Sequence, residues 1–152
     1  MKNPFLYVLV LGIIFQISCG PKKVEQTRFL TFKANPSYIG SHPTVGLESN
    51  IFIVDKESKM QFNIDMVGIN ETKTYKLHIH AADTSEPYGY SGNPIIDLGT
   101  MTNNLPMTGD VTTMPFSEFT DNFKGYYIVH DPDNISNDTT TLLIFGKIGS
   151  DW

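Results

Sequence analysis

The stretch Tyr75-Lys76-Leu77-His78-Ile79-His80-Ala81 alternates apolar and polar side chains over its whole length. Successive side chains of an extended strand point to opposite faces, so this period of two predicts a β-strand over residues 74–81. His78 and His80 then project together from one face. The apolar side chains project from the other face, which we assign to a hydrophobic core.

Similar runs, rich in β-branched and aromatic residues, recur along the chain between Gly, Pro, Asn and Asp, with no helical periodicity. Their close spacing predicts an all-β fold, an antiparallel sandwich or barrel of about eight short strands. One helical turn is expected near residue 117, capped by the Ser117 hydroxyl. The predicted strands are Thr27–Ala34, Leu47–Asp55, Met60–Val67, Thr74–Ala81, Pro94–Met101, Gly109–Met114, Gly125–His130 and Thr140–Gly146.

The N-terminal segment has the pattern of an export signal. Lys2 precedes an apolar stretch that ends at Ser18-Cys19-Gly20, and Cys19 is the only cysteine in the chain. A small residue before that cysteine resembles the end of a bacterial lipoprotein signal. We predict a lipoprotein signal peptide over residues 1–18, a lipidated Cys19 with a tether over 19–26, and one domain over 27–152. An ordinary secretory signal or an uncleaved anchor helix are the alternatives.

From these features we predict a location in the bacterial cell envelope, in the periplasm or at the outer membrane. The membrane is then a partner through the lipid on Cys19. The chain of 152 residues has 11 Lys and Arg against 16 Asp and Glu, a formal net charge of −5. No basic cluster follows any predicted face, which argues against a nucleic-acid partner. With one cysteine the domain has no intramolecular disulfide, so its core alone must stabilise it.

A second run, Tyr126-Tyr127-Ile128-Val129-His130, places a third histidine on another predicted strand. Two imidazoles on one strand and a third on another can close around one metal ion. Imidazole suits copper and zinc better than calcium or magnesium. We therefore predict a metal site formed by His78, His80 and His130. His42 either supplies a fourth ligand or is an exposed loop residue.

The residues around these runs allow two interpretations each. Asp131 and Asp133 can orient the His130 ring by accepting its free N–H, or they can belong to a plain turn, Asp131-Pro132-Asp133-Asn134. The polar, aromatic stretch from Asp83 to Asn93 is either a functional loop or a solvated crossover between sheets.

Four elements, in order, resemble the copper/zinc superoxide dismutase family. They are Met66–Asn70 with the following His-x-His strand, Ile96-Asp97-Leu98-Gly99, Lys124–Asp133 with its Val-His pair, and Phe145-Gly146-Lys147-Ile148-Gly149. The resemblance covers roughly residues 48–149 and implies an immunoglobulin-like Greek-key sandwich. It also implies that His78, His80 and His130 are copper ligands. Asp97 matches the carboxylate ligand of the family's neighbouring zinc site.

The chain departs from that family where activity is concerned. The bridging histidine and both further zinc histidines are missing after His80, so we expect copper as the cofactor and no intact zinc site. The family's disulfide cysteines are absent, and the apolar stretch 141–144 replaces its guiding arginine. We expect weak or absent dismutase activity, with copper ions and superoxide as candidate small partners. Asp97 is then expected to accept backbone hydrogen bonds at a strand end.

A second resemblance points to a different class of function. Gly92-Asn93-Pro94-Ile95-Ile96-Asp97-Leu98-Gly99 is similar to an element of chordin-type domains, which also carry a His-x-His strand and a later Val-His. That resemblance implies a non-catalytic interaction module whose histidines are structural. Copper storage or delivery is a third possibility and uses the same site without turnover. Convergence of the three ring nitrogens on one point favours a copper site over the module.

Overall fold

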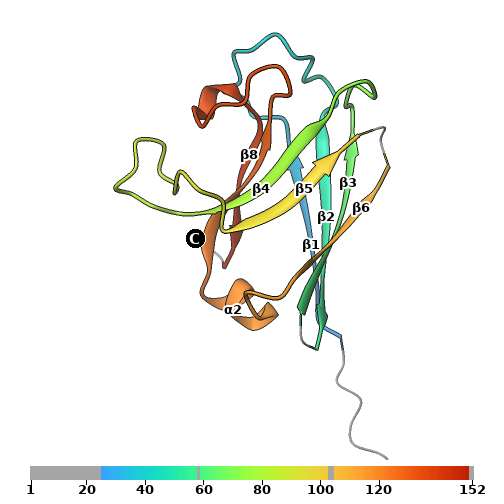
Figure 1. Ribbon diagram of the computed structural model, residues 1–152, viewed down its shortest axis with the longest axis vertical. Coiled ribbons are helices and arrows are strands. Elements are labelled where there is room, and N and C mark those ends of the chain that lie inside the picture. Colours follow the sequence, from blue (N-terminus) through green and yellow to red (C-terminus); the bar gives the residue numbers. More distant parts are fainter. Residues whose placement is uncertain (1–24, 58, 103–104, 151–152) are drawn as a thin grey trace, which may run out of the picture.

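The computed structural model describes residues 25–57, 59–102 and 105–150. Within these ranges the chain is all-β, with eight strands in two four-stranded antiparallel sheets (Figure 1). This confirms the prediction of an all-β fold of about eight antiparallel strands. The first sheet has the order β1 (Thr27–Lys33), β2 (Glu48–Lys56), β3 (Lys59–Val67) and β6 (Met107–Val111). The second has the order β5 (Ile96–Met101), β4 (Tyr75–Ala81), β7 (Lys124–His130) and β8 (Leu142–Gly149).

The hydrophobic core lies between the two sheets, which makes the domain a β-sandwich. Alternate apolar residues of each strand point into it, such as Leu77 and Ile79 of β4. The short helix α2 (Phe116–Asp121) covers one end of the core, where the rings of Phe119 and Phe62 meet edge-on with centroids 5.7 Å apart. Burial of each such ring contributes about 1.5–3 kcal/mol to folding.

The predicted strand bounds agree with the observed ones to within three residues at every end. The largest shifts have local causes. Strand β6 ends at Val111 because its last partner on β3 is Met60, and a 3-10 turn, η1 (Thr139–Thr141), delays the start of β8. The predicted cap at Ser117 is wrong. The cap position of helix α2 is Pro115, two residues earlier, and no side chain caps the helix.

The N-terminal predictions concern residues that the structure leaves largely undescribed. The signal peptide over 1–18 and Cys19 lie outside the described residues, and only Glu25 and Gln26 of the tether lie within them. No helix in the described ranges is long and apolar enough to cross a membrane.

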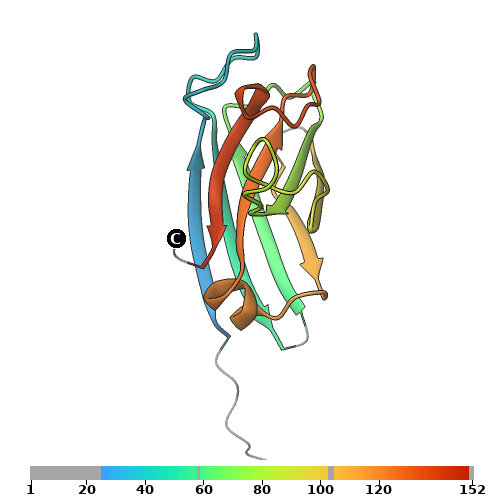
Figure 2. The same ribbon diagram turned by 90° about the vertical axis from the view of Figure 1, so that its left-hand side faces the viewer.

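The face of the second sheet that points away from the core carries a second, smaller apolar cluster. Tyr90, Ile128 and Leu142 form it, with Tyr126 and Phe145 packed against them. The connection between β4 and β5, residues 82–95, lies over this face (Figure 2). A bridge between Ala82 and Tyr90 closes this loop on itself, and the buried side chain of Tyr90 packs it against the sheet. The predicted metal ligands lie on this same covered face.

Candidate metal centre

The pairing of β4 with β7 brings three histidines together. His78 pairs with Ile128, and His130 follows two residues later on the same face of β7. His80 lies two residues beyond His78 on β4. Ring centroids are 5.8 Å apart for His78 and His80, and 5.2 Å apart for His78 and His130. One ring nitrogen of each residue lies within 4.8 Å of the other two, so the predicted convergence is observed.

Irregularities in the sheet occur beside two of these histidines. The register between β4 and β5 shifts between Leu77 and His78, and the register between β7 and β8 shifts between Val129 and His130. A bulge bends the strand locally and changes the direction of the adjacent side chain. The two shifts therefore change the directions of the His78 and His130 side chains, which converge with His80.

Backbone carbonyls from two loops fix the orientation of two rings. Nδ1 of His80 lies 2.7 Å from the carbonyl oxygen of Ser91, and Nδ1 of His130 lies 3.1 Å from that of Ser136. Since a carbonyl only accepts, each Nδ1 carries the proton and each Nε2 has its lone pair free. Nε2 of His80 is buried and has no hydrogen-bond partner among the described residues. A buried polar atom without a partner is costly, and a metal ion would satisfy it.

The third ring, His78, is the most accessible of the three, with 17% of its side chain exposed. Its Nε2 lies 3.6 Å from a carboxylate oxygen of Asp97, which is 70% exposed. The same oxygen of Asp97 accepts a hydrogen bond from the backbone N–H of Gly99 at 2.8 Å. The expected structural role of Asp97 at a strand end is thus observed.

All three rings favour the neutral form. Burial is the largest cause and lowers the pKa of His78, His80 and His130, in the last case to about 4. The neighbouring His78 lowers the pKa of His130 further, and Lys76 adds a smaller effect of the same sign. Neutral imidazoles are the form that binds metal ions, so near pH 7 the cluster can bind a cation without first releasing protons.

An aromatic layer encloses the cluster on one side. The ring of Tyr90 meets that of His80 edge-on at 5.1 Å between centroids, and its hydroxyl donates to the carbonyl of Asn137. Burial raises the pKa of Tyr90 to about 12, so it stays a neutral phenol. A surface hollow near α2, lined by Gln26, Asp55 and Phe116 among others, includes none of the histidines. The cluster is therefore a compact side-chain site and not part of that hollow.

Two sequence predictions about this site differ from the structure. His42 is not a fourth ligand and is not exposed. It is buried, its Nε2 lies 3.0 Å from the hydroxyl of Tyr75, and Tyr75 points to the core side of β4. Of the two interpretations of Asp131 and Asp133, the turn from Asp131 to Asn134 is observed, and the orientation of His130 is not, because its Nδ1 contacts Ser136 instead.

The physical reason for the second correction is the alternation of strand side chains. Asp131 follows His130 directly, so it points to the other face of the sheet and accepts a hydrogen bond from the Tyr38 hydroxyl. The sequence interpretation also missed Ser91 and Ser136. Both act through their backbone carbonyls and belong to loops, so no residue type marks them in the sequence.

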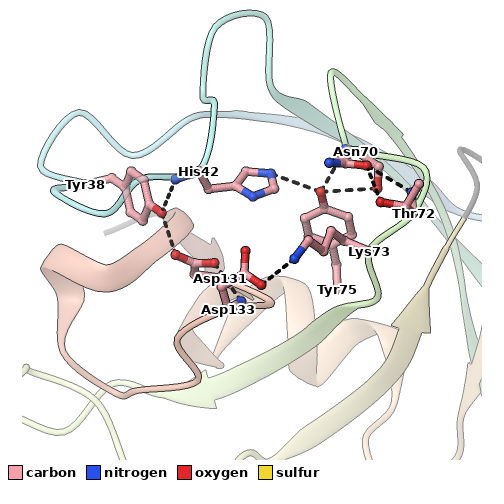
Figure 3. Close-up of polar contacts among 8 residues, drawn as sticks. All are labelled: Tyr38, His42, Asn70, Thr72, Lys73, Tyr75, Asp131 and Asp133. Atoms are coloured by element: carbon pink, nitrogen blue, oxygen red, sulfur yellow. Dashed lines mark hydrogen bonds and ion pairs between the residues drawn. The ribbon is translucent and has the colours of Figure 1, made fainter.

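A second group of possible ligands lies beyond the end of β7. One ligand atom each of His42, Asp131 and Asp133 lies within 4.8 Å of the others. Figure 3 shows this group with its neighbours Tyr38, Lys73 and Tyr75. Within the described residues, these two groups are the clusters of three or more potential metal ligands.

Comparison with protein-family models, with curated proteins and with solved structures gave no match. The assignments below therefore depend on the geometry and chemistry of the residues themselves.

Proposed function

We propose that this protein binds copper through His78, His80 and His130 on a superoxide dismutase-like sandwich, as a lipoprotein of the bacterial envelope. One observation carries the proposal: the buried Nε2 of His80 lacks a partner and lies in a group of three converging imidazoles. Three neutral imidazoles suit Cu(I) and Cu(II) and leave a coordination position open. When bound, copper would supply one-electron redox chemistry, while the chain supplies the three nitrogens and holds two of the rings through Ser91 and Ser136.

The strand order supports a Greek-key topology of the kind that the superoxide dismutase resemblance implies. Strand β7 lies beside β4, although β5 and β6 come between them in the sequence, and β6 lies beside β3. A strand that returns over a long connection to lie beside an earlier strand is the defining step of a Greek key.

Dismutase activity is proposed to be weak or absent. Fast capture of superoxide needs a positive approach to the metal. The exposed Asp97 beside His78 opposes an anion, while the positive charge of Lys76 acts on the same ring. Arg28, the one arginine of the chain, lies on β1 in the other sheet and donates to the carbonyl of Gly149.

A non-catalytic module with structural histidines is the second candidate. The backbone bonds of His80 to Ser91 and of His130 to Ser136 favour it, because such bonds are sufficient to hold both rings in place. That interpretation leaves the Nε2 of His80 unexplained. Copper storage or delivery would use the same ligands and differs only in lacking turnover.

The test is a Cu(I) titration of the purified protein against a chromophoric chelator. We expect a dissociation constant below about 1 µM, and a loss of about tenfold or more in His78→Gln. His42→Gln is the matched control, since it removes a histidine outside the cluster and should leave Cu(I) affinity unchanged. Far-UV circular dichroism checks the fold of each variant. Binding no tighter than micromolar rejects the copper site.

A superoxide assay on the copper-loaded protein tests the proposal that its dismutase activity is weak or absent. We expect a rate constant well below the diffusion ceiling of about 10⁸–10⁹ M⁻¹s⁻¹. A rate at that ceiling refutes weak activity and leaves the copper site standing.

A further inference from the structure

The cluster of His42, Asp131 and Asp133 draws its residues from two separate parts of the chain. His42 belongs to the loop between β1 and β2, and the two carboxylates follow the end of β7. One ligand atom of each lies within 4.8 Å of the other two. His42 is 8% exposed and Asp131 is 3% exposed, while Asp133 faces solvent. Two members of the group are therefore buried, and solvent can reach the third, Asp133.

The ring of His42 is held from one side only. Its Nε2 lies 3.0 Å from the hydroxyl of Tyr75, which also accepts a hydrogen bond from the backbone N–H of Asn70 at 2.8 Å. Nδ1 has no hydrogen-bond partner among the described residues. In Figure 3 this nitrogen lies on the edge of the ring that faces the two carboxylates. The ring is thereby oriented with a free nitrogen toward Asp131 and Asp133.

Asp131 is the less usual member, because a buried carboxylate normally has a cationic partner or a metal ion. One of its oxygens accepts from the Tyr38 hydroxyl at 2.5 Å, and the other from the backbone N–H of Asp133 at 2.9 Å. Neither donor carries a charge. No cation forms an ion pair with Asp131 among the described residues. Its negative charge is buried with two neutral hydrogen bonds, and further lone pairs on both oxygens can accept a metal ion.

Asp133 already pairs with one cation, Lys73. Nζ of Lys73 lies 2.5 Å from one of its oxygens, with both side chains partly exposed. Among the described residues, no cation pairs with the second oxygen of Asp133. Two carboxylates against one lysine leave an excess of one negative charge beside the free nitrogen of His42.

We propose that His42, Asp131 and Asp133 form a binding site for a divalent transition-metal cation of the zinc class. One imidazole nitrogen and two carboxylate oxygens are zinc ligands, and a water molecule would complete four-coordination. Tetrahedral zinc sets its ligand atoms about 3.3 Å apart, so the side chains must rotate to shorten separations that are now up to 4.8 Å. The site is separate from the histidine cluster and does not use Asp97, the carboxylate that the dismutase resemblance assigns to zinc.

The test is a Zn²⁺ titration of the His78→Gln variant, which lacks one ligand of the histidine cluster. We expect one equivalent of Zn²⁺ to bind with a dissociation constant below about 10 µM. Adding Asp133→Asn removes an exposed ligand and keeps an acceptor for Lys73, and it should weaken binding about tenfold or more. Asp110→Asn is the matched control, because Asp110 is also an exposed aspartate paired with a lysine, Lys59. It should leave the affinity within about twofold of the starting value.

A third variant tests whether Lys73 competes with the metal ion for Asp133. Lys73→Met removes the resident cation from Asp133 and should tighten Zn²⁺ binding several-fold. Urea unfolding in the absence of metal shows whether each variant is folded. The proposal is overturned if no Zn²⁺ binds tighter than about 1 mM, or if Asp133→Asn and Asp110→Asn weaken binding equally. Weaker binding in Lys73→Met also contradicts it.

Discussion

The metal-free protein should lose stability between pH 7 and pH 5, and His130, with the largest of the three pKa shifts, should contribute about 2 kcal/mol of the loss. Its side chain is 3% exposed, and burial lowers its pKa from 6.5 to about 4. In the unfolded chain the same imidazole titrates near its ordinary value, so at pH 5 the unfolded state binds a proton that the folded state does not. Stability therefore falls as pH falls through 6.5, and the loss levels off below the folded pKa.

The size of the effect follows from the two pKa values. Linkage gives a loss of about 2 kcal/mol in the free energy of unfolding between pH 7 and pH 5, and about 3 kcal/mol by pH 4. The pKa values of His78 and His80 are lowered as well, so they add losses of the same sign. The carboxyl groups of Asp110 and Asp138 have pKa values below 3.8 and lose their contribution only at lower pH. The window from pH 7 to pH 5 therefore isolates the histidines.

Urea unfolding at several pH values, followed by far-UV circular dichroism, measures this loss. The matched variant is His130→Asn, whose amide N–H can still donate to the carbonyl of Ser136 but whose side chain does not titrate. Between pH 7 and pH 5, the free energy of unfolding of this variant should fall by about 2 kcal/mol less than that of the wild type, even if the variant is less stable at pH 7. Equal pH slopes for both proteins would refute the argument that the buried ring stays neutral.

Two further predictions concern packing. Phe62→Ala should lower the free energy of unfolding by about 3–5 kcal/mol in urea titrations, because Phe62 is fully buried against Phe119. Gly125→Ala should cost about 1–3 kcal/mol and weaken Cu(I) binding, since its Cβ would lie 2.4 Å from the carbonyl oxygen of His80. Gly92→Ala, where the same atom meets nothing within 4 Å, should stay within about 0.5 kcal/mol of wild type. Comparable losses at both glycines would contradict the steric explanation.

The fold could be predicted because its strands follow a period of two almost without exception. In β4 and β7 each core residue alternates with one on the outer face, so strand identity and side-chain direction follow from the same pattern. Strand ends were harder to predict. The last three residues of β8, Lys147 to Gly149, were missed because two glycines look like a terminator. In the structure they still pair with β7.

The candidate metal centre could be predicted in part, for the same reason. Alternation placed His78, His80 and His130 on one face, but nothing local could show that β4 and β7 are neighbours. The groups that orient the rings are backbone atoms of distant loops and leave no signature in the sequence. Asp131 is different. The rule that placed His130 on one face also places Asp131 on the other, so this correction could have been made from the sequence.

That alternation has a chemical consequence for the two proposed sites. His130 and Asp131 are consecutive, yet each belongs to a different cluster. On one face the ligands are three neutral nitrogens with Lys76 nearby, a set that favours copper over harder cations. On the other, two carboxylate oxygens and one nitrogen favour zinc-class ions, and Lys73 competes for Asp133. His130, the last residue of β7, and Asp131, which follows it, can therefore contribute to two proposed sites of different ligand chemistry, because their side chains point to opposite faces of the sheet.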